Sequence, residues 1–251
     1  MIPLGRMAGS RHRRLWLAAL LFLALPAFAI VNGTAVSEAR FVDQYPWAVA
    51  LVGIEKGGVC TAQLVAPGWV LTAAHCSSMG VEVRLGARDR GQAKVVQVAE
   101  AIRHPLYDKE TGVWDVGLLR LAEPVAGPVV ALASTEDAAA LLKENALAAI
   151  AGWGKRVSGA GFSELLVESE VALGALRRDE SRFIFIDRAS GPCGGDSGGP
   201  LLLRRADGSR VLVGIASRVA GNLCADGGGI SVYADVAAAR PFIEQHVPGL
   251  R

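Results

Sequence analysis

Short apolar runs separated by Gly, Pro and Asp follow one another along most of the chain. Runs of this length, closely and regularly spaced, predict antiparallel strands in a barrel or a sandwich. The expected strands form two sets of six, at residues 47–52, 61–65, 69–72, 81–85, 94–98 and 116–121, and then at 147–152, 165–173, 182–186, 200–203, 211–216 and 229–233. The pattern therefore indicates an all-β fold.

Two segments depart from this β pattern. Ser134, followed by Thr135, Glu136 and Asp137, precedes residues 138–143 and has the features of a helix start with a capping serine. This helix would lie between the two sets of strands. Residues 240–246 predict a terminal helix with Arg240 and Pro241 in its first turn.

The first 29 residues have the composition of a secretory signal peptide. They contain four arginines and no acidic residue, then the apolar stretch 15–28 and a small-residue end at Ala27 and Ala29. About 14 apolar residues are fewer than the roughly 20 that cross a bilayer, so we expect a removable leader rather than a stable membrane anchor. Arg13 and Arg14 also fit a twin-arginine signal, and the export route stays open.

Composition and charge narrow the class of protein further. With 251 residues, of which 51% are hydrophobic, the chain can bury a large core in one long unit or two modest domains. Removing the four leader arginines from 26 basic residues leaves 22 against 24 acidic residues, a net charge of −2. This balance gives no reason to expect nucleic acid or an anionic membrane as a partner.

Four cysteines, Cys60, Cys76, Cys193 and Cys224, all follow the leader. An even number in an exported chain predicts two disulfides, for which three pairings are possible. A zinc site is the alternative use of four cysteines, but the Cys-x-x-Cys spacing of such sites does not occur. The predicted location is secreted or periplasmic.

Three motifs carry the candidate chemistry. Ser197 lies in Gly194-Gly195-Asp196-Ser197-Gly198-Gly199-Pro200, His75 lies in Leu71-Thr72-Ala73-Ala74-His75-Cys76, and Asp115 opens the apolar run 116–121. A serine hydroxyl needs a base to take its proton, and a histidine acting as that base needs an acid to fix its tautomer. The order His75, Asp115, Ser197 is one of the known orders of a catalytic triad.

With these motifs the chain resembles the chymotrypsin-like (trypsin-fold) serine proteases. The resemblance runs from Ile30-Val31-Asn32-Gly33 through Ala151-Gly152-Trp153-Gly154 to residues 240–246, nearly everything after the leader. It implies two six-stranded antiparallel barrels and a C-terminal helix. A signal peptide over 1–29 would precede a peptidase domain over 30–251, with barrels at about 30–133 and 146–251.

The family resemblance also implies roles for individual residues. It implies that the substrates are proteins or peptides and that the reaction needs no metal or organic cofactor. It also implies an oxyanion hole made by the backbone N–H groups of Gly195 and Ser197. It assigns Ser217 to support Asp115, and it pairs Cys60 with Cys76 and Cys193 with Cys224. A protein inhibitor is a further possible partner.

The pocket for the residue before the scissile bond is also located by the resemblance. Its base corresponds to Gly191, and its walls correspond to Val219 and Ser231. Without an aspartate at the base, selection of Arg or Lys is not expected, and Val219 should narrow the pocket to favour small apolar residues. Arg218 stands where the family usually has tryptophan.

The resemblance further implies an activation device. In the family, a new N-terminus of the Ile-Val-x-Gly type inserts into the protein and its ammonium pairs with the aspartate before the nucleophile, here Asp196. Because the expected leader cleavage site directly precedes Ile30, we expect export itself to activate the enzyme.

Two other functions fit part of the sequence. Residues 195–199 also match the Gly-x-Ser-x-Gly motif of α/β-hydrolase esterases, but the only histidine after Ser197 is His246, inside a predicted helix. A catalytically silent binding module with the protease fold is the second alternative, because a fold does not by itself establish a function. A protease-fold protein that has lost its activity usually lacks a triad member, and this chain has all three.

Overall fold

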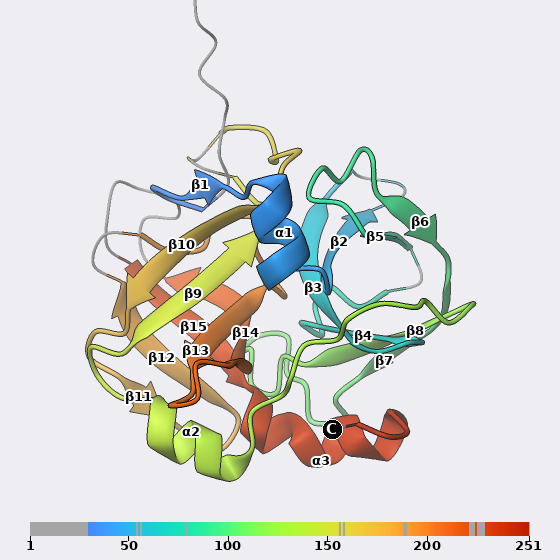
Figure 1. Ribbon diagram of the computed structural model, residues 1–251. Helices are drawn as coiled ribbons and strands as arrows, with labels where there is room; N and C mark the ends of the chain where they lie inside the picture. Colours follow the sequence, from blue (N-terminus) through green and yellow to red (C-terminus); the bar gives the residue numbers. More distant parts are fainter. Residues whose placement is uncertain are drawn as a thin grey trace, which may run out of the picture.

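Two curled antiparallel sheets lie side by side and make up most of the molecule (Figure 1). This computed structural model describes residues 30–250 except 54, 56, 79, 156, 158, 188–189, 221–223 and 225–228. The predicted leader lies outside the described residues. The expectation of an all-β fold with two antiparallel barrels and a C-terminal helix is confirmed, since the structure is mostly β-sheet in two curled sheets and ends in a helix.

The first sheet has seven strands in the order β6-β5-β2-β3-β4-β8-β7. Its members are β2 (Ala48–Gly53), β3 (Val59–Ala66), β4 (Trp69–Thr72), β5 (Val81–Leu85), β6 (Lys94–Val96), β7 (Val98–Arg103) and β8 (Gly117–Leu121). Almost every residue of the central strand β3 is buried. One face of this strand fills the interior of its own sheet, and the other faces the second sheet.

The second sheet has eight strands in the order β1-β10-β9-β13-β14-β15-β12-β11. Its members are β1 (Thr34–Ala35), β9 (Leu147–Gly152), β10 (Val167–Ala172), β11 (Arg177–Arg178), β12 (Arg182–Asp187), β13 (Pro200–Arg204), β14 (Arg210–Ala220) and β15 (Gly229–Asp235). Strand β1 pairs with β10, so the start of the described chain joins the sheet that is otherwise built from its second half.

The predicted strands match most of these elements, and β4, β5 and β9 have the predicted bounds. The sheets contain seven and eight strands rather than six each. The expected strand 94–98 is divided between β6 and β7, and β7 continues to Arg103. Strands β1 and β11 have only two residues each, too few for an alternating pattern to be visible in the sequence.

Three helices occur in the described residues. Helix α1 (Glu38–Gln44) was not predicted, since Phe41 is its only buried residue. Helix α2 (Thr135–Leu141) begins at the predicted cap, where Ser134 and Asp137 form a capping box. Helix α3 (Val236–His246) starts earlier than predicted, because Asp235 caps it and Pro241 lies inside it rather than in its first turn.

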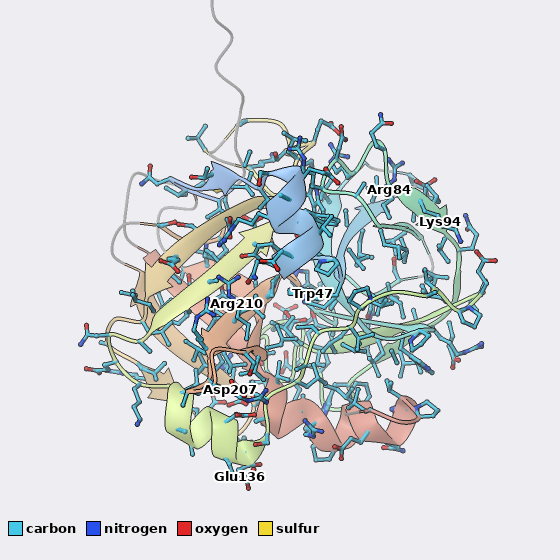
Figure 2. The ribbon with its side chains drawn as sticks, viewed as in Figure 1. Trp47, Arg84, Lys94, Glu136, Asp207 and Arg210 are labelled. Atoms are coloured by element: carbon cyan, nitrogen blue, oxygen red, sulfur yellow. A yellow bond between two sulfur atoms is a disulfide. The ribbon has the colours of Figure 1, made fainter. Side chains whose placement is uncertain are left out.

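The seam between the sheets is partly polar, and the outer surface carries the charges. Tyr45, which is fully buried, accepts a hydrogen bond from Arg210 of β14 at 3.2 Å and packs its ring edge-on against Trp47. Exposed charged residues such as Lys94 and Glu136 lie at the periphery of the two halves (Figure 2). Within the described ranges, no helix is both long enough and apolar enough to cross a membrane.

Candidate active site

His75 and Asp115 are joined by two hydrogen bonds where β4 and β8 meet. The backbone N–H of His75 donates to Asp115 Oδ1 at 3.0 Å, and His75 Nδ1 lies 2.8 Å from Asp115 Oδ2. Ser217 of β14, in the other sheet, donates its hydroxyl to the same Oδ2 at 2.6 Å. The carboxylate is thus held by groups from both halves of the molecule, and it fixes the imidazole orientation.

Asp115 is only 1% exposed. Burial works to raise the pKa of its carboxyl, but hydrogen bonds from His75 and Ser217 and the charge of His75 outweigh burial and hold that pKa below its ordinary value. Asp115 is therefore an anion at neutral pH. An anion at this position is suited to stabilise an imidazolium at His75.

The backbone around Asp115 is held by an aromatic stack. Trp114 has φ of 53°, a left-handed conformation that is uncommon for a non-glycine residue. Its ring stacks on His104 at a centroid distance of 4.4 Å, and the His104 ring meets Phe242 of α3 at 4.8 Å. Burial lowers the pKa of His104. His104 thus links Trp114 to helix α3.

Ser197 lies in a tight turn within the oxyanion loop, which we define as residues 193–198. Gly195 and Gly198 have φ of 99° and 79°, which favour glycine. A Cβ on Gly198 would lie 2.1 Å from the Thr72 hydroxyl, and one on Gly195 would lie 2.7 Å from the Phe162 ring. Both glycines are therefore required for this backbone path.

Asp196 points away from the cleft into the protein and is 2% exposed. Its oxygens accept hydrogen bonds from the N–H groups of Gly154 at 2.8 Å and Cys193 at 2.9 Å, and Ile30 supplies a third backbone bond. Burial raises the pKa of Asp196 to about 7, only partly offset by these bonds. No charged side chain in the described residues contributes to this shift, so the carboxylate lacks a cation.

The segment that begins at Ile30 is firmly seated beside Asp196. Ile30 is 1% exposed, the Val31 N–H donates to the Gly191 carbonyl at 3.1 Å, and the Ser190 hydroxyl donates to the Val31 carbonyl at 2.6 Å. The nitrogen of Ile30 therefore lies where an ammonium would meet the buried carboxylate.

A cavity of about 280 Å³ adjoins Ser197, and Val219 forms part of its wall. Ser231 lies opposite Val219 in the β14–β15 pairing and is fully buried. Gly191 directly precedes a lining residue, Pro192, although it does not itself line the cavity. The complete described lining is Pro192, Cys193, Gly194, Ser197, Ala216, Ser217, Arg218 and Val219.

Arg218 is turned toward the opposite side of the cleft. Its guanidinium donates to the carbonyls of Glu110 at 3.0 Å and Lys109 at 3.2 Å. A second arginine, Arg182 of β12, donates to the Thr111 carbonyl at 2.6 Å. Two arginines of the second half thus hold the turn 109–111 of the first half. Of these two, Arg218 is the residue that stands where the family usually has tryptophan.

A second cavity, of about 400 Å³, is lined by His75 and by the disulfide next to it. The two disulfides, Cys60–Cys76 and Cys193–Cys224, are the pairs that the resemblance implies. The sulfur atoms of Cys60 and Cys76 lie within metal-ligand spacing of His75, but their disulfide leaves neither as a thiolate ligand.

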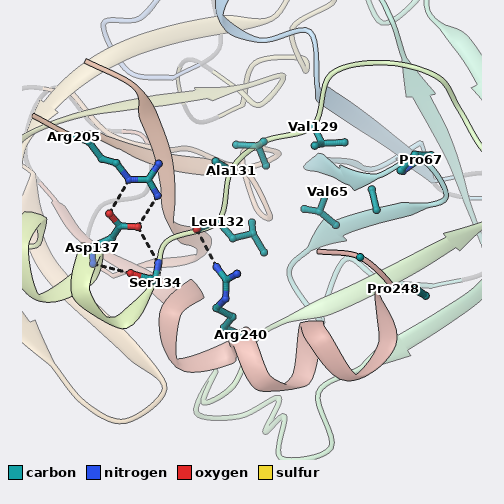
Figure 3. Close-up of a pocket in the computed structure, with 13 residues that line it drawn as sticks. Val65, Pro67, Val129, Ala131, Leu132, Ser134, Asp137, Arg205, Arg240 and Pro248 are labelled. Atoms are coloured by element: carbon teal, nitrogen blue, oxygen red, sulfur yellow. Dashed lines mark hydrogen bonds and ion pairs between the residues drawn. The ribbon is translucent and has the colours of Figure 1, made fainter. Parts of the chain in front are cut away.

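A larger cavity, of about 730 Å³, lies elsewhere, between the connection of the two halves and α3 (Figure 3). Arg205 pairs there with Asp137, and Arg240 donates to the Leu132 carbonyl at 3.2 Å. Its described lining includes none of the candidate catalytic residues. The arginine side chains are held by intramolecular partners, so we assign this cavity no role in the reaction.

Comparison with known proteins decides the family. The Trypsin family profile matches residues 30–243, most of the chain. The chain belongs to the trypsin family. It is similar to Trypsin 5G1 of Aedes aegypti, with 29% identity over 98% of this chain and 94% of that protein, and to a trypsin of Simulium vittatum, with 30% identity over 78% and 91%.

A third relative is much longer than this chain. Transmembrane protease serine 9 of Rattus norvegicus is 31% identical over 87% of this chain, which covers 22% of that protein. Membership of the trypsin family makes the chain a serine endopeptidase, a hydrolase of the kind that acts on protein or peptide substrates. Trypsin-like proteases with disulfides are typically extracellular.

Sequence reasoning missed two polar residues beside this site, Thr61 and Gln63 of β3. Both are fully buried in an otherwise apolar strand. Their signal in the sequence was two polar positions, two residues apart, in a run of apolar ones. Such a pattern normally indicates a solvent-facing side of a strand, and only the second sheet makes that side an interior one.

Proposed function

We propose that this chain is an exported serine endopeptidase in which Ser197 is the nucleophile, His75 the general base and Asp115 the residue that orients His75. The observation that carries the proposal is the Asp115 carboxylate, buried and bonded at once to His75 and to Ser217 across the two halves. This arrangement leaves the far nitrogen of the His75 ring to accept a proton from the serine hydroxyl.

The proposed reaction balances without a cofactor. Ser197 Oγ bonds to the peptide carbonyl carbon while its proton passes to His75, and the N–H groups of Gly195 and Ser197 stabilise the oxyanion. The C–N bond then breaks as His75 returns the proton to the leaving amine. Water repeats the sequence on the acyl-enzyme and releases the acid.

Two cavities fit the two sides of the scissile bond. We assign the cavity beside Ser197, with Val219 in its wall and Gly191 and Ser231 nearby, to the residue before the bond. We assign the cavity lined by His75 and the Cys60–Cys76 disulfide to the residues after it. The proposal also includes a leader over 1–29 and two barrel domains at about 30–133 and 146–251. A protein inhibitor is a further partner that it includes.

The first prediction concerns substrate choice. Peptides with Ala or Val before the scissile bond should be cleaved faster than those with Arg, Lys or Phe, because Val219 narrows the pocket and Gly191 brings no charge. One methylene in such a pocket changes kcat/KM by about 10- to 200-fold, so the preference should be graded. Cleavage of a peptide library by mature protein measures this directly.

Val219→Gly provides the matched variant, with Val219→Ala as an intermediate. The enlarged pocket should move the preference toward larger apolar residues in the order Val, Ala, Gly at this position. A strong preference of the unmodified enzyme for Arg would contradict the pocket assignment.

The second prediction concerns activation. Signal-peptidase cleavage before Ile30 would place an ammonium against the Asp196 carboxylate, which in the uncut chain is buried with a pKa raised to about 7. A buried charge is tolerated when an opposite charge meets it. N-terminal sequencing of exported, active enzyme should give Ile-Val-Asn-Gly, and one extra residue before Ile30 should abolish most activity.

The pH profile follows from the same pair. Pairing raises the Ile30 amine pKa above its unfolded value near 8, so its stabilisation is complete below about 8 and is lost as pH rises through the folded pKa. Activity should fall in alkaline solution for this reason, and in acid because protonated His75 cannot act as a base. Active enzyme that starts at another residue would contradict this mechanism.

A further inference from the structure

Thr61 and Gln63 lie under the nucleophile but take no part in the triad. They are two residues apart on β3, so their side chains share one face of the strand. Both have 0% exposure, and every side-chain hydrogen bond described for them reaches a residue of the second half of the chain. These two residues connect the first sheet to the loop that carries the reaction.

Thr61 contacts the oxyanion loop at two points. Its hydroxyl donates to the Gly195 carbonyl at 3.3 Å, and its backbone N–H donates to the Ser197 carbonyl at 2.8 Å. The hydroxyl also accepts from the Trp153 N–H at 3.3 Å. Trp153 lies outside the loop, so this bond holds the Thr61 hydroxyl in position as a donor even when the loop changes conformation.

Gln63 holds the end of the same loop. Its Nε2 donates to the Gly198 carbonyl at 2.6 Å, while the Gly198 N–H donates to Ala216 at 2.7 Å. Its Oε1 is buried without a hydrogen-bond partner among the described residues. An unsatisfied buried oxygen costs stability, so packing alone would favour an apolar residue here.

We propose that Thr61 and Gln63 are positioning residues that hold the oxyanion loop, residues 193–198, in its active conformation from the opposite sheet. The inference rests on the proposed function, in which Gly195 and Ser197 stabilise the oxyanion and the Ile30 ammonium orders the loop. The two side chains and the ammonium stabilise one loop conformation together. Losing either contribution shifts the same equilibrium between ordered and open loop.

This coupling gives a measurable signature. Deprotonation of Ile30 opens the loop, and the midpoint of that transition rises with the ratio of ordered to open loop. A tenfold smaller ratio lowers the alkaline midpoint of activity by about one pH unit. While the ordered form still predominates, activity at the pH optimum hardly changes. A residue that affects only global stability would leave the midpoint where it is.

Other charged groups near the loop are few and can be controlled. Lys155, next to Gly154, places its ammonium 5.0 Å from the Phe162 ring centroid. On β10, which packs beside the Ile30 segment, Glu168 is paired with Arg40 and Glu170 is exposed. His75 and Asp115 lie across the cleft. Lys155 carries the one ammonium among these groups and lies beside Phe162, which packs against Gly195, so Lys155→Met should be the background for the test.

The experiment compares kcat/KM from pH 7 to pH 11 for mature enzyme beginning at Ile30. Thr61→Val and Gln63→Met should each lower the alkaline midpoint by about one unit, because each leaves a loop carbonyl without its donor. Thr61→Ser keeps the hydroxyl and should restore the midpoint. Ser181→Ala is the matched control, since its buried hydroxyl donates at 3.1 Å to Asp179 and makes no described hydrogen bond to the loop.

Hydrogen exchange of the amides at 193–198 provides a second measurement that needs neither catalysis nor Ile30. Exchange in Thr61→Val should be about tenfold faster than in Thr61→Ser or Ser181→Ala. An unchanged midpoint together with unchanged exchange would overturn the inference. A wild-type enzyme with no alkaline loss of activity would instead overturn the Ile30 mechanism, and the exchange rates alone would then decide the role of Thr61.

Discussion

Ser197→Ala is expected to lower kcat by about 10⁶-fold while the protein remains folded. The members of a triad act as a unit, so removing the nucleophile removes nearly all the catalysis that they provide together. The hydroxyl adds little to packing at the edge of a cavity, and the thermal midpoint should therefore stay close to that of wild type. Hydrolysis of a chromogenic peptide by purified mature protein measures the loss.

Ser209→Ala is the matched control for this change. Ser209 lies in an exposed turn, where its hydroxyl donates to Asp207 at 2.7 Å, far from the nucleophile in the described structure. This variant should retain full activity. Retained hydrolysis by Ser197→Ala would instead show that another residue is the nucleophile.

Asp115→Asn is expected to lower kcat by about 10⁴-fold near neutral pH. An amide of the same shape can donate to His75 Nδ1, and this favours the imidazole tautomer that cannot accept the serine proton. The amide also cannot stabilise the imidazolium as the buried carboxylate does. The pH dependence of kcat for this variant, measured beside Asp207→Asn as an exposed control, tests the proposal.

A loss of only a few-fold in Asp115→Asn would mean that Asp115 is structural. Its contacts with His75 and Ser217 would then hold the two halves together without tuning the base. Unfolding measurements on the same variant separate these outcomes, because a purely structural role predicts lost stability with retained kcat.

The strands of this fold were largely predictable, because each is a local apolar run bounded by turn residues. Strand β9, for example, is buried at five of its six positions and has the predicted bounds. Helix α1 was not predictable by the same reasoning, since its single buried residue, Phe41, gives no helical periodicity. The start of α3 was misplaced because Pro241 normally marks the first turn of a helix, whereas here Asp235 supplies the cap.

The candidate catalytic residues were found from motifs, but their surroundings were not. His75, Asp115 and Ser197 each lie in a short recognisable segment of the sequence. Thr61 and Gln63 act on carbonyls 134 and 135 positions away, and no local pattern encodes such contacts. The hydrogen bonds from Arg218 to the carbonyls of Lys109 and Glu110 are equally non-local. Sequence motifs thus identify candidate reacting groups, but they do not reveal the long-range contacts around those groups.

The central claim, that Ser197 is an activated nucleophile, is tested most directly by labelling with a fluorophosphonate. Mature protein beginning at Ile30 should take up one equivalent, and peptide mapping should place it on Ser197. Asp115→Asn should label far more slowly, and Ser197→Ala should not label. Absence of labelling in protein that still hydrolyses peptides, or a label on another residue, would contradict the account.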